Sequence, residues 1–578
     1  MLAPRGGIAR CEVRALRLEL IEARFFRIEV GEGTVRLHSF EHAAQDLPLV
    51  HDGLIERIHG KYRRTTSARK DQSDGRYSQW CVLHINHSGN DAAAHCASTR
   101  INKQMQYVAR RHCRKTRKSP KAVRRTLTVE RKFASLRPPS LSATRGWDSA
   151  ILRPMTQRKP VRPSEGLANV RYEIRGKLAR RALALERLGY DIVSLNIGNP
   201  YAFGFRTPET MRLAMIENLR NSEGYVHQKG IFPAREAVVM QQQERGVRGV
   251  TVEEVFIGNG VSELIDLTLR ALLNPGDEVL VPSPDYPLWT AAVNLNSGRA
   301  VHYPCLATRS FIPDPQDIEA LVTKRTRAIV IVNPNNPTGA VYPRETLTAI
   351  AQLAEKHRLV VLSDEVYDHI VYDGAEFIPM ATLVHNTLCC TMSGLSKVYR
   401  ACGYRVGWAA FSGDIESAGE YLSGLELLSS LRLCSNVPGQ WAVQTALGGY
   451  QSIGELTRPG GRLYESRQAI LDGVARSKYL KLSRPMGALY AFVEVRADLL
   501  PDFDDQAFAL ELLENKHVLV APGVSFNVPY RNSFRITNLP EPQVLATVFS
   551  RIEEVLEGHA AARPGLQVVG SQPRVRQH

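Results

Sequence analysis

Residues 328–342 read AIVIVNPNNPTGAVY, and residues 360–370 read VVLSDEVYDHI. Each stretch begins with a short, continuous apolar run and then turns polar, and the polar part includes Asn336 in the first and Asp364 in the second. Residues 346–357, between the two, have the composition of a helix. Continuous apolar strands that alternate with helices are typical of a parallel sheet covered on both faces. Ligands of such sheets bind beyond the carboxyl ends of the strands, so these polar residues are candidates for a functional site.

The same pattern extends outward along the chain. Two more apolar runs, 279–281 and 388–392, predict further strands of this sheet. The second run leads into SGLSKVYRACGYRVGW at 393–408, which brings Lys397 and Arg405 close to a strand end. Taken singly, such residues could be helix caps, turn residues or solvated charges. Because they occur together and in this order, we predict an α/β fold with a site at one edge of its sheet.

Charge is distributed unevenly along the 578 residues. Residues 1–154 contain 30 of the 74 lysines and arginines and 14 of the 58 acidic residues, a net charge of +16 that equals that of the whole chain. The stretch at 110–132, RRHCRKTRKSPKAVRRTLTVERK, has no strand or helix periodicity, and such charge blocks usually stay solvated. We expect residues 1–154 to be disordered, or to precede a true start at or near Met155; 578 less 154 leaves 424 residues.

Histidines and cysteines in the basic segment suggest zinc, but their order and gaps match no ligand pattern with two well-spaced pairs. They are His84, His87, His95, Cys96, His112 and Cys113. We therefore predict no metal site.

The number and spacing of the cysteines and the hydropathy of the chain indicate the cellular compartment. Nine cysteines without a CxxC pair fit a reducing environment. The mean hydropathy is −0.22, and no apolar run approaches the ~18 residues that a membrane span needs. The first residues lack the apolar segment and cleavage site of a secretory signal. We expect a cytoplasmic protein without a membrane partner.

A longer series of motifs surrounds the candidate residues. In chain order they are LNIGNPYAFGF, GYVHQKGI, IGNGVSELI, PSPDYPLWTAAV, NPNNPTGAVY, SDEVYD, SGLSKVYRACGYRVGW, RLCSNVPGQWAVQTALGGYQS and FRIT. Through them, residues 169–558 resemble the fold-type I pyridoxal phosphate aminotransferases of class I/II, most closely the bacterial glutamate–pyruvate (alanine) aminotransferases. The resemblance implies a large domain with a mostly parallel sheet covered by helices, and a smaller α/β domain.

The resemblance assigns roles around the cofactor ring. Lys397 matches the Schiff-base lysine, which then moves a proton at the substrate Cα. Asp364 matches the carboxylate that keeps the pyridine nitrogen protonated. Asn336 and Tyr367 match the donors to the ring phenolic oxygen, and Tyr286 matches the aromatic residue stacked on the ring, although it could be an ordinary core tyrosine. Lys397, Asp364 and Tyr367 are thus the expected catalytic residues.

The cofactor phosphate needs backbone donors and a cation. The sequence GNGVSEL opens a helix-like segment whose first N–H groups could bind an anion. Arg405, eight residues after Lys397, matches the phosphate arginine. Many relatives have serine three residues before the lysine, where this chain has Gly394, so either neighbouring serine is a candidate. The expected phosphate ligands are Gly260, Val261, Ser262, Ser393, Ser396 and Arg405.

Substrate and subunit contacts also follow from the resemblance. Arg535 in FRIT matches the arginine that binds the substrate α-carboxylate, assisted by the backbone N–H of Gly198 and by Asn336. Tyr225 in GYVHQKG matches a tyrosine that reaches the cofactor phosphate of the neighbouring subunit. A homodimer with shared active sites is therefore expected.

We predict a ping-pong aminotransferase, with alanine and 2-oxoglutarate as the favoured pair. Aspartate, aromatic or branched-chain amino acids stay open, because spacing does not define the side-chain pocket. A β-lyase is a more distant alternative. Some bacterial regulators join a winged-helix domain to an aminotransferase-like domain, but residues 1–154 lack the order of three helices and a hairpin, so we expect no nucleic-acid partner.

The expected domain limits follow from these assignments. They are a basic extension at 1–154, an N-terminal arm with part of the small domain at 155–200, the cofactor-binding large domain at 201–450, the small domain at 451–560 and a flexible tail at 561–578.

Overall fold

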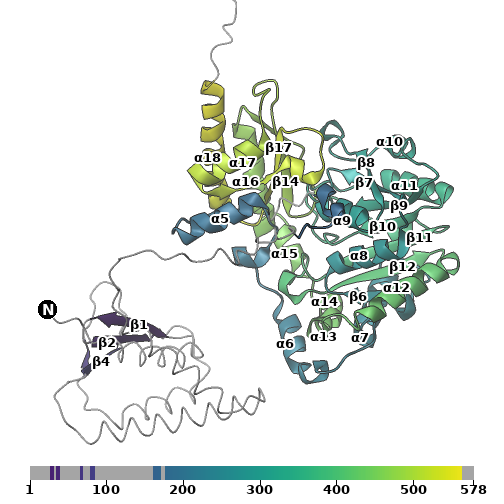
Figure 1. Ribbon diagram of the computed structural model, residues 1–578, viewed down its shortest axis with the longest axis horizontal. Helices are drawn as coiled ribbons and strands as arrows, with labels where there is room; N and C mark the ends of the chain where they lie inside the picture. Colours follow the sequence, from purple (N-terminus) through teal and green to yellow (C-terminus); the bar gives the residue numbers. More distant parts are fainter. Residues whose placement is uncertain are drawn as a thin grey trace, which may run out of the picture. The chain divides into compact units, whose positions relative to one another are not determined.

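The computed structural model describes residues 161–170 and 176–562, and four strands nearer the N-terminus. The chain divides into two compact units, Met1–Pro154 and Met155–His578. In the first unit the described strands form an antiparallel sheet of order β1-β2-β4-β3 (Figure 1). Their bounds are β1 Phe26–Gly31, β2 Thr34–Ser39, β3 Thr66–Ala68 and β4 Gln79–His84. The expectation of disorder for the rest of 1–154, and the side chains considered for zinc, lie outside the described residues.

A seven-stranded sheet organises the second unit, with the strand order β6-β12-β11-β10-β9-β7-β8 (Figure 1). Only β12 runs antiparallel to its neighbours, so the sheet is mostly parallel. The bounds are β6 Val255–Gly258, β7 Glu278–Ser283, β8 Arg299–Pro304, β9 Thr326–Val332, β10 Val360–Asp364, β11 Leu388–Gly394 and β12 Gly407–Gly413. The four strands predicted from apolar runs are confirmed as β7, β9, β10 and β11, and the predicted helix is α11, Arg344–His357.

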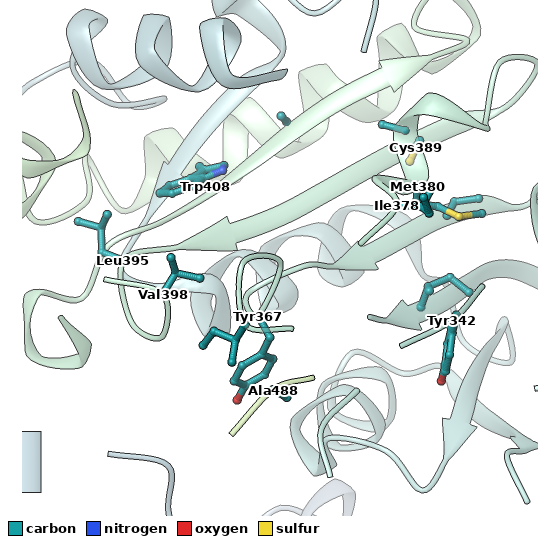
Figure 2. Close-up of a cluster of buried hydrophobic side chains, with 14 of the residues drawn as sticks. Tyr342, Tyr367, Ile378, Met380, Cys389, Leu395, Val398, Trp408 and Ala488 are labelled. Atoms are coloured by element: carbon teal, nitrogen blue, oxygen red, sulfur yellow. The ribbon is translucent and has the colours of Figure 1, made fainter. Parts of the chain in front are cut away.

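The central strands of this sheet are buried on both faces, which explains their largely apolar sequences, whereas the edge strand β8, RAVHYP, is less buried. Successive residues of a strand point to opposite faces, so Ile329 and Ile331 lie in one core cluster and Val330 in the other. Cys389 and Trp408, from β11 and β12, belong to the first cluster together with Tyr367 (Figure 2). Helices α7 Phe232–Glu244, α11 and α14 Ala442–Gly448 cover that cluster, and α8 Val261–Leu272, α9 Pro287–Leu295 and α12 Gly419–Leu431 cover the other.

A smaller four-stranded antiparallel sheet, of order β13-β14-β17-β16, forms a separate core. Its strands are β13 Leu480–Leu482, β14 Tyr490–Val495, β16 Ala521–Pro522 and β17 Ser533–Thr537, and its helices are α16 Arg462–Arg476, α17 Asp505–Lys516 and α18 Pro542–Ala561. The start of the second unit joins it: α5 Lys177–Arg187 packs on α17, and β5 Val193–Ser194 pairs with β15 Val518–Leu519. The shorter helices are α6 Glu209–Glu217, α10 Pro315–Glu319, α13 Val437–Gln440 and α15 Ile453–Thr457. No helix in the described part of the chain is long and apolar enough to cross a membrane.

The turn after β9 connects the two sheets. The carbonyl of Gly339 accepts hydrogen bonds from the backbone N–H groups of Met486 and Gly487, each 2.8 Å long. Gly339 has a φ of +73°, and a Cβ at this position would lie 2.4 Å from the Cβ of Pro485. Only glycine therefore lets this turn approach the segment that leads into β14.

Candidate active site

The candidate residues collect at one edge of the seven-stranded sheet. Tyr286, Asn336, Asp364 and Lys397 lie at or just after the carboxyl ends of four parallel strands, β7, β9, β10 and β11. The antiparallel β12 begins at the same edge, because its first residue pairs with the last residues of β6 and β11. Arg405, just before β12, and Gly260, just after β6, are thereby brought to this edge as well.

Lys397 reaches back to the loop that follows β5. Its Nζ donates a 2.7 Å hydrogen bond to the carbonyl oxygen of Gly198. A Cβ on Gly198 would lie 2.3 Å from the hydroxyl oxygen of Tyr490, so a side chain there would collide with a buried ring. The absence of a side chain at Gly198 thus allows the lysine, the loop and Tyr490 to pack together.

Asp364 is a buried carboxylate with a fixed orientation. The side chain is 3% exposed, and its Oδ2 accepts a 3.1 Å hydrogen bond from the indole Nε1 of Trp289. Burial raises the pKa of Asp364 to about 6, although the Trp289 hydrogen bond, the backbone N–H of Val366 and the charge of Lys397 oppose this change. A cationic group that came close to this carboxylate would stabilise its ionised form.

Arg535 lies on β17 and is 2% exposed. Its Nη1 donates a 2.8 Å hydrogen bond to the Oδ1 of Asn336, and its Nη2 donates to the carbonyl of Asn196. The guanidinium is stacked against two aromatic rings, 4.1 Å from the ring centre of Tyr490 and 4.7 Å from that of Phe526. Its Nε is buried without a hydrogen-bond partner among the described residues, which leaves a donor for an anionic ligand.

Tyr367 follows β10 and meets Tyr490 from the small sheet. The Tyr367 hydroxyl donates a 3.1 Å hydrogen bond to the hydroxyl of Tyr490, and the two rings meet edge to face with centres 5.9 Å apart. Burial raises the pKa of Tyr367 well above its ordinary value. Tyr367 is therefore neutral at physiological pH and keeps its proton to donate.

The Arg405 guanidinium lies against the turn that begins α8. The Arg405 guanidinium donates to the carbonyl of Cys402 at 3.0 Å and to that of Asn259 at 3.3 Å. A Cβ on Gly260, whose φ is +81°, would lie 2.5 Å from the Arg405 Nη2. Val261 and Ser262 are the first residues of α8, and their N–H groups belong to the helix end that favours anions.

The two candidate serines differ in surroundings. Ser393 is buried on β11, and its Oγ donates a 3.4 Å hydrogen bond to the carbonyl of Glu365. Ser396 is partly buried, and its carbonyl accepts a hydrogen bond from the thiol of Cys402.

Tyr225 lies apart from these groups in a single chain. Its side chain is 81% exposed, in the loop between the 3-10 turn Arg220–Ser222 and α7.

Three site residues are not singled out by the sequence analysis: Trp289, Tyr490 and Phe526. Trp289 and Tyr490 stand in the stretches PDYPLW and PMGALYAFVEV, but no spacing relates them to Asp364 or Tyr367. Their roles depend on contacts between segments far apart in the chain, and a single sequence carries no signal for such contacts.

The chain is similar in sequence and structure to known proteins. Residues 190–552 match the family model described as "Aminotransferase class I and II". The chain is 48% identical over 400 residues to the glutamate–pyruvate aminotransferase AlaA of Escherichia coli K12, covering 69% of this chain and 99% of that protein. It is 45% identical over 394 residues to an alanine aminotransferase of Mycobacterium bovis, covering 68% and 92%. A crystal structure of an Escherichia coli aminotransferase superposes with a TM-score of 0.68 at 48% identity, covering 69% of this chain and 99% of that one.

Proposed function

This chain belongs to the class I and II aminotransferases, and we propose that it exchanges an amino group between alanine and 2-oxoglutarate with pyridoxal phosphate as cofactor. The observation that carries the substrate pair is the 48% identity to a glutamate–pyruvate aminotransferase across 99% of that protein. The alanine aminotransferase of Mycobacterium bovis, at 45% identity, supports the same choice.

The residues present fit the cofactor. A buried carboxylate at Asp364, the amine of Lys397 and an exposed guanidinium beside Gly260 provide a partner for each polar part of the molecule. Bound pyridoxal phosphate supplies an electron sink for the bonds at the substrate Cα. Lys397 would bind its aldehyde, Asp364 would hold the proton of its ring nitrogen, and Tyr286 would stack on the ring. Asn336 and Tyr367 would donate to its phenolic oxygen.

The phosphate would be held by the start of α8 and by Arg405. Gly260, Val261 and Ser262 would provide backbone and hydroxyl donors, with Ser393 or Ser396 as a further ligand. The close approach of the Arg405 guanidinium to Gly260 supports this assignment, because it brings a positive charge to the N-terminal end of α8.

The substrate carboxylate would bind Arg535, with Asn336 and the N–H of Gly198 beside it. The stacking of the guanidinium between Tyr490 and Phe526 fixes its plane and leaves its N–H edge for a carboxylate. Lys397 would then move the proton at the substrate Cα.

We infer a cytoplasmic homodimer as the active form. The segment from 219 to 240 carries several exposed apolar side chains, Leu219, Tyr225, Phe232 and Met240, which a second copy would cover. The described cysteines are free thiols, which fits a reducing compartment.

The test is a donor screen with the purified full-length holoenzyme. Each common amino acid is incubated with 2-oxoglutarate, and glutamate formation is followed. Alanine should give the highest kcat/KM, and pyruvate should accept the amino group of glutamate in the reverse reaction. Faster turnover of aspartate, an aromatic or a branched-chain amino acid than of alanine would contradict the proposed substrate.

A further inference from the structure

Tyr490 lies where the two sheets of the second unit meet and is 4% exposed. It is the first residue of β14, which pairs antiparallel with β17, and the register sets Tyr490 opposite Thr537 and Phe492 opposite Arg535. Side chains two residues apart in such a pair share a face. Tyr490 and Arg535 therefore stack diagonally, with the guanidinium 4.1 Å from the ring centre.

The hydroxyl of Tyr490 contacts the large-domain side of the site. It accepts the 3.1 Å hydrogen bond from Tyr367, and it faces Gly198, whose Cβ would lie 2.3 Å from it. The carbonyl of the same Gly198 accepts the hydrogen bond of Lys397. One phenol thus touches Tyr367 through its oxygen, Arg535 through its ring, and the loop that binds Lys397.

The charges around this phenol make its hydroxyl more acidic and therefore a stronger hydrogen-bond donor. Burial raises the pKa of Tyr490, but the positive charges of Lys397 and Arg535 and the hydrogen bond from Tyr367 together lower it below its ordinary value, opposed by the thiol of Cys402. Negative charge on the Tyr490 oxygen is stabilised there, whereas burial keeps the proton on Tyr367. A hydroxyl carries one proton, so when Tyr367 donates to the phenolic oxygen of the cofactor, its own oxygen accepts a hydrogen bond from Tyr490, and the contact between the two hydroxyls is kept.

We propose that Tyr490 is a positioning residue of the aminotransferase site, which orients the Tyr367 hydroxyl and couples it to the charges of Lys397 and Arg535. The proposal rests on the proposed function, because it assigns Tyr367 to the cofactor and Arg535 to the substrate. A carboxylate bound to Arg535 would offset the positive charge of this arginine, which is one of the charges that lower the pKa of Tyr490. Substrate binding in the small domain would in this way reach Tyr367 in the large domain through a single side chain.

The test compares Tyr490→Phe with the unmodified holoenzyme. Phenylalanine keeps the ring that stacks on Arg535, so KM for the amino acid should stay within about threefold, whereas kcat should fall about tenfold because Tyr367 is no longer oriented. The pH midpoint of the visible absorbance of the bound cofactor, recorded without substrate, should shift by about half a unit to one unit. An unchanged midpoint together with an unchanged kcat would overturn the proposal.

Two further variants separate positioning from general packing. Tyr303→Phe is the matched control, since the Tyr303 hydroxyl is also buried and donates a 2.7 Å hydrogen bond, but to the carbonyl of Val330 within the large sheet. It should leave the midpoint in place. Because Tyr490 acts through Tyr367, the double variant with Tyr367→Phe should be about as impaired as Tyr367→Phe alone. Losses that multiply in the double variant would instead show independent roles and overturn the proposal.

If Tyr490→Phe does not fold, a fluorinated tyrosine at position 490 keeps the hydroxyl and makes it more acidic. The cofactor midpoint should then move, and a fixed midpoint would overturn the proposal. None of these midpoints depends on the substrate added. A failure of alanine as donor would therefore contradict the proposed function and leave this test intact.

Discussion

Removing Lys397 should abolish chemistry while preserving the fold. In the described part of the chain its amine donates one hydrogen bond, to the carbonyl of Gly198, and the side chain is partly exposed, so Lys397→Ala should cost about 1 kcal/mol of stability or less. Because the proposed function gives this one amine both the anchoring of the cofactor and the transfer of the proton, kcat should fall at least ~10³-fold. Borohydride reduction followed by peptide mapping should find pyridoxal phosphate attached to Lys397 in the unmodified enzyme and to no peptide of the variant.

A surface lysine provides the control for that experiment. Lys356 on α11 pairs with Glu319 and is mostly exposed, so Lys356→Ala should keep activity and covalent attachment. Attachment that persists in Lys397→Ala would mean that another lysine anchors the cofactor.

The site residues differ in how far sequence could predict them. Asn336, Asp364 and Lys397 are recognisable because each follows an apolar strand, and the ends of parallel strands meet at one edge. Tyr490 and Trp289 sit inside apolar stretches that look like ordinary core. What makes them part of the site is contact with residues far away in the chain, namely Trp289 with Asp364, and Tyr490 with Tyr367 and Arg535.

Strand composition explains a similar difference for the larger elements. The strands buried on both faces were predictable from continuous apolar runs, since every position meets a helix or a neighbouring core. The antiparallel direction of β12 could not be predicted, because the apolar composition of a strand does not indicate its direction relative to its neighbours.

The loop between β7 and α9 is joined to the small domain through Asp285. The carboxylate of Asp285 accepts hydrogen bonds from Thr290 and from the Nδ2 of Asn527, the latter 2.9 Å long, and its backbone N–H donates to the carbonyl of Phe526. His302 lies nearby, with its Nε2 2.9 Å from the Oγ1 of Thr290. Burial raises the pKa of Asp285 from 3.8 to about 7, against the two side-chain hydrogen bonds.

This change in pKa makes the stability of the enzyme depend on pH. The folded state holds the Asp285 proton more tightly than the unfolded chain does, so the stabilisation is complete below pH 3.8 and is lost as the pH rises through about 7. Asp285→Asn cannot ionise. We compare the unfolding free energies of this variant and of the unmodified apoenzyme by urea unfolding. From pH 5 to pH 8 the difference between them should change by on the order of 2 kcal/mol in favour of the variant.

Asp498→Asn is the matched control for the urea experiment. A hydrogen bond from Arg496 lowers the pKa of Asp498, so this exposed group is ionised in both the folded and unfolded states throughout that pH range. The difference between this variant and the unmodified enzyme should stay constant from pH 5 to pH 8. A constant difference for Asp285→Asn as well would show that Asp285 is ionised in the folded protein across the range.

The second unit as a whole combines distant parts of the chain in one site. Arg535 and Tyr490 come from the small sheet, Asn336, Asp364 and Lys397 from the large one, and Gly198 from the loop after β5. The turn at Gly339 and the loop at Asp285 each hydrogen-bond to small-domain backbone close to these residues. The arrangement of the two domains therefore determines the distance between the amine of Lys397 and the guanidinium of Arg535.

The exposed Tyr225 predicts that a complete site needs two chains. If Tyr225 completes the phosphate site of the neighbouring subunit, each site takes Lys397 from one subunit and Tyr225 from the other. Tyr225→Phe and Lys397→Ala then remove groups that different subunits supply to the same site. Mixing the two inactive or weakened parents, with subunit exchange by mild denaturation, should form hybrids with one intact site and one doubly damaged site. At a cofactor concentration that fills intact sites but few of the sites without the Tyr225 hydroxyl, random exchange should restore about a quarter of the unmodified activity, because half of the dimers are hybrids with one working site of two. Activity no higher than the mean of the parents, with hybrids demonstrated by native mass spectrometry, would place Tyr225 outside the partner's site.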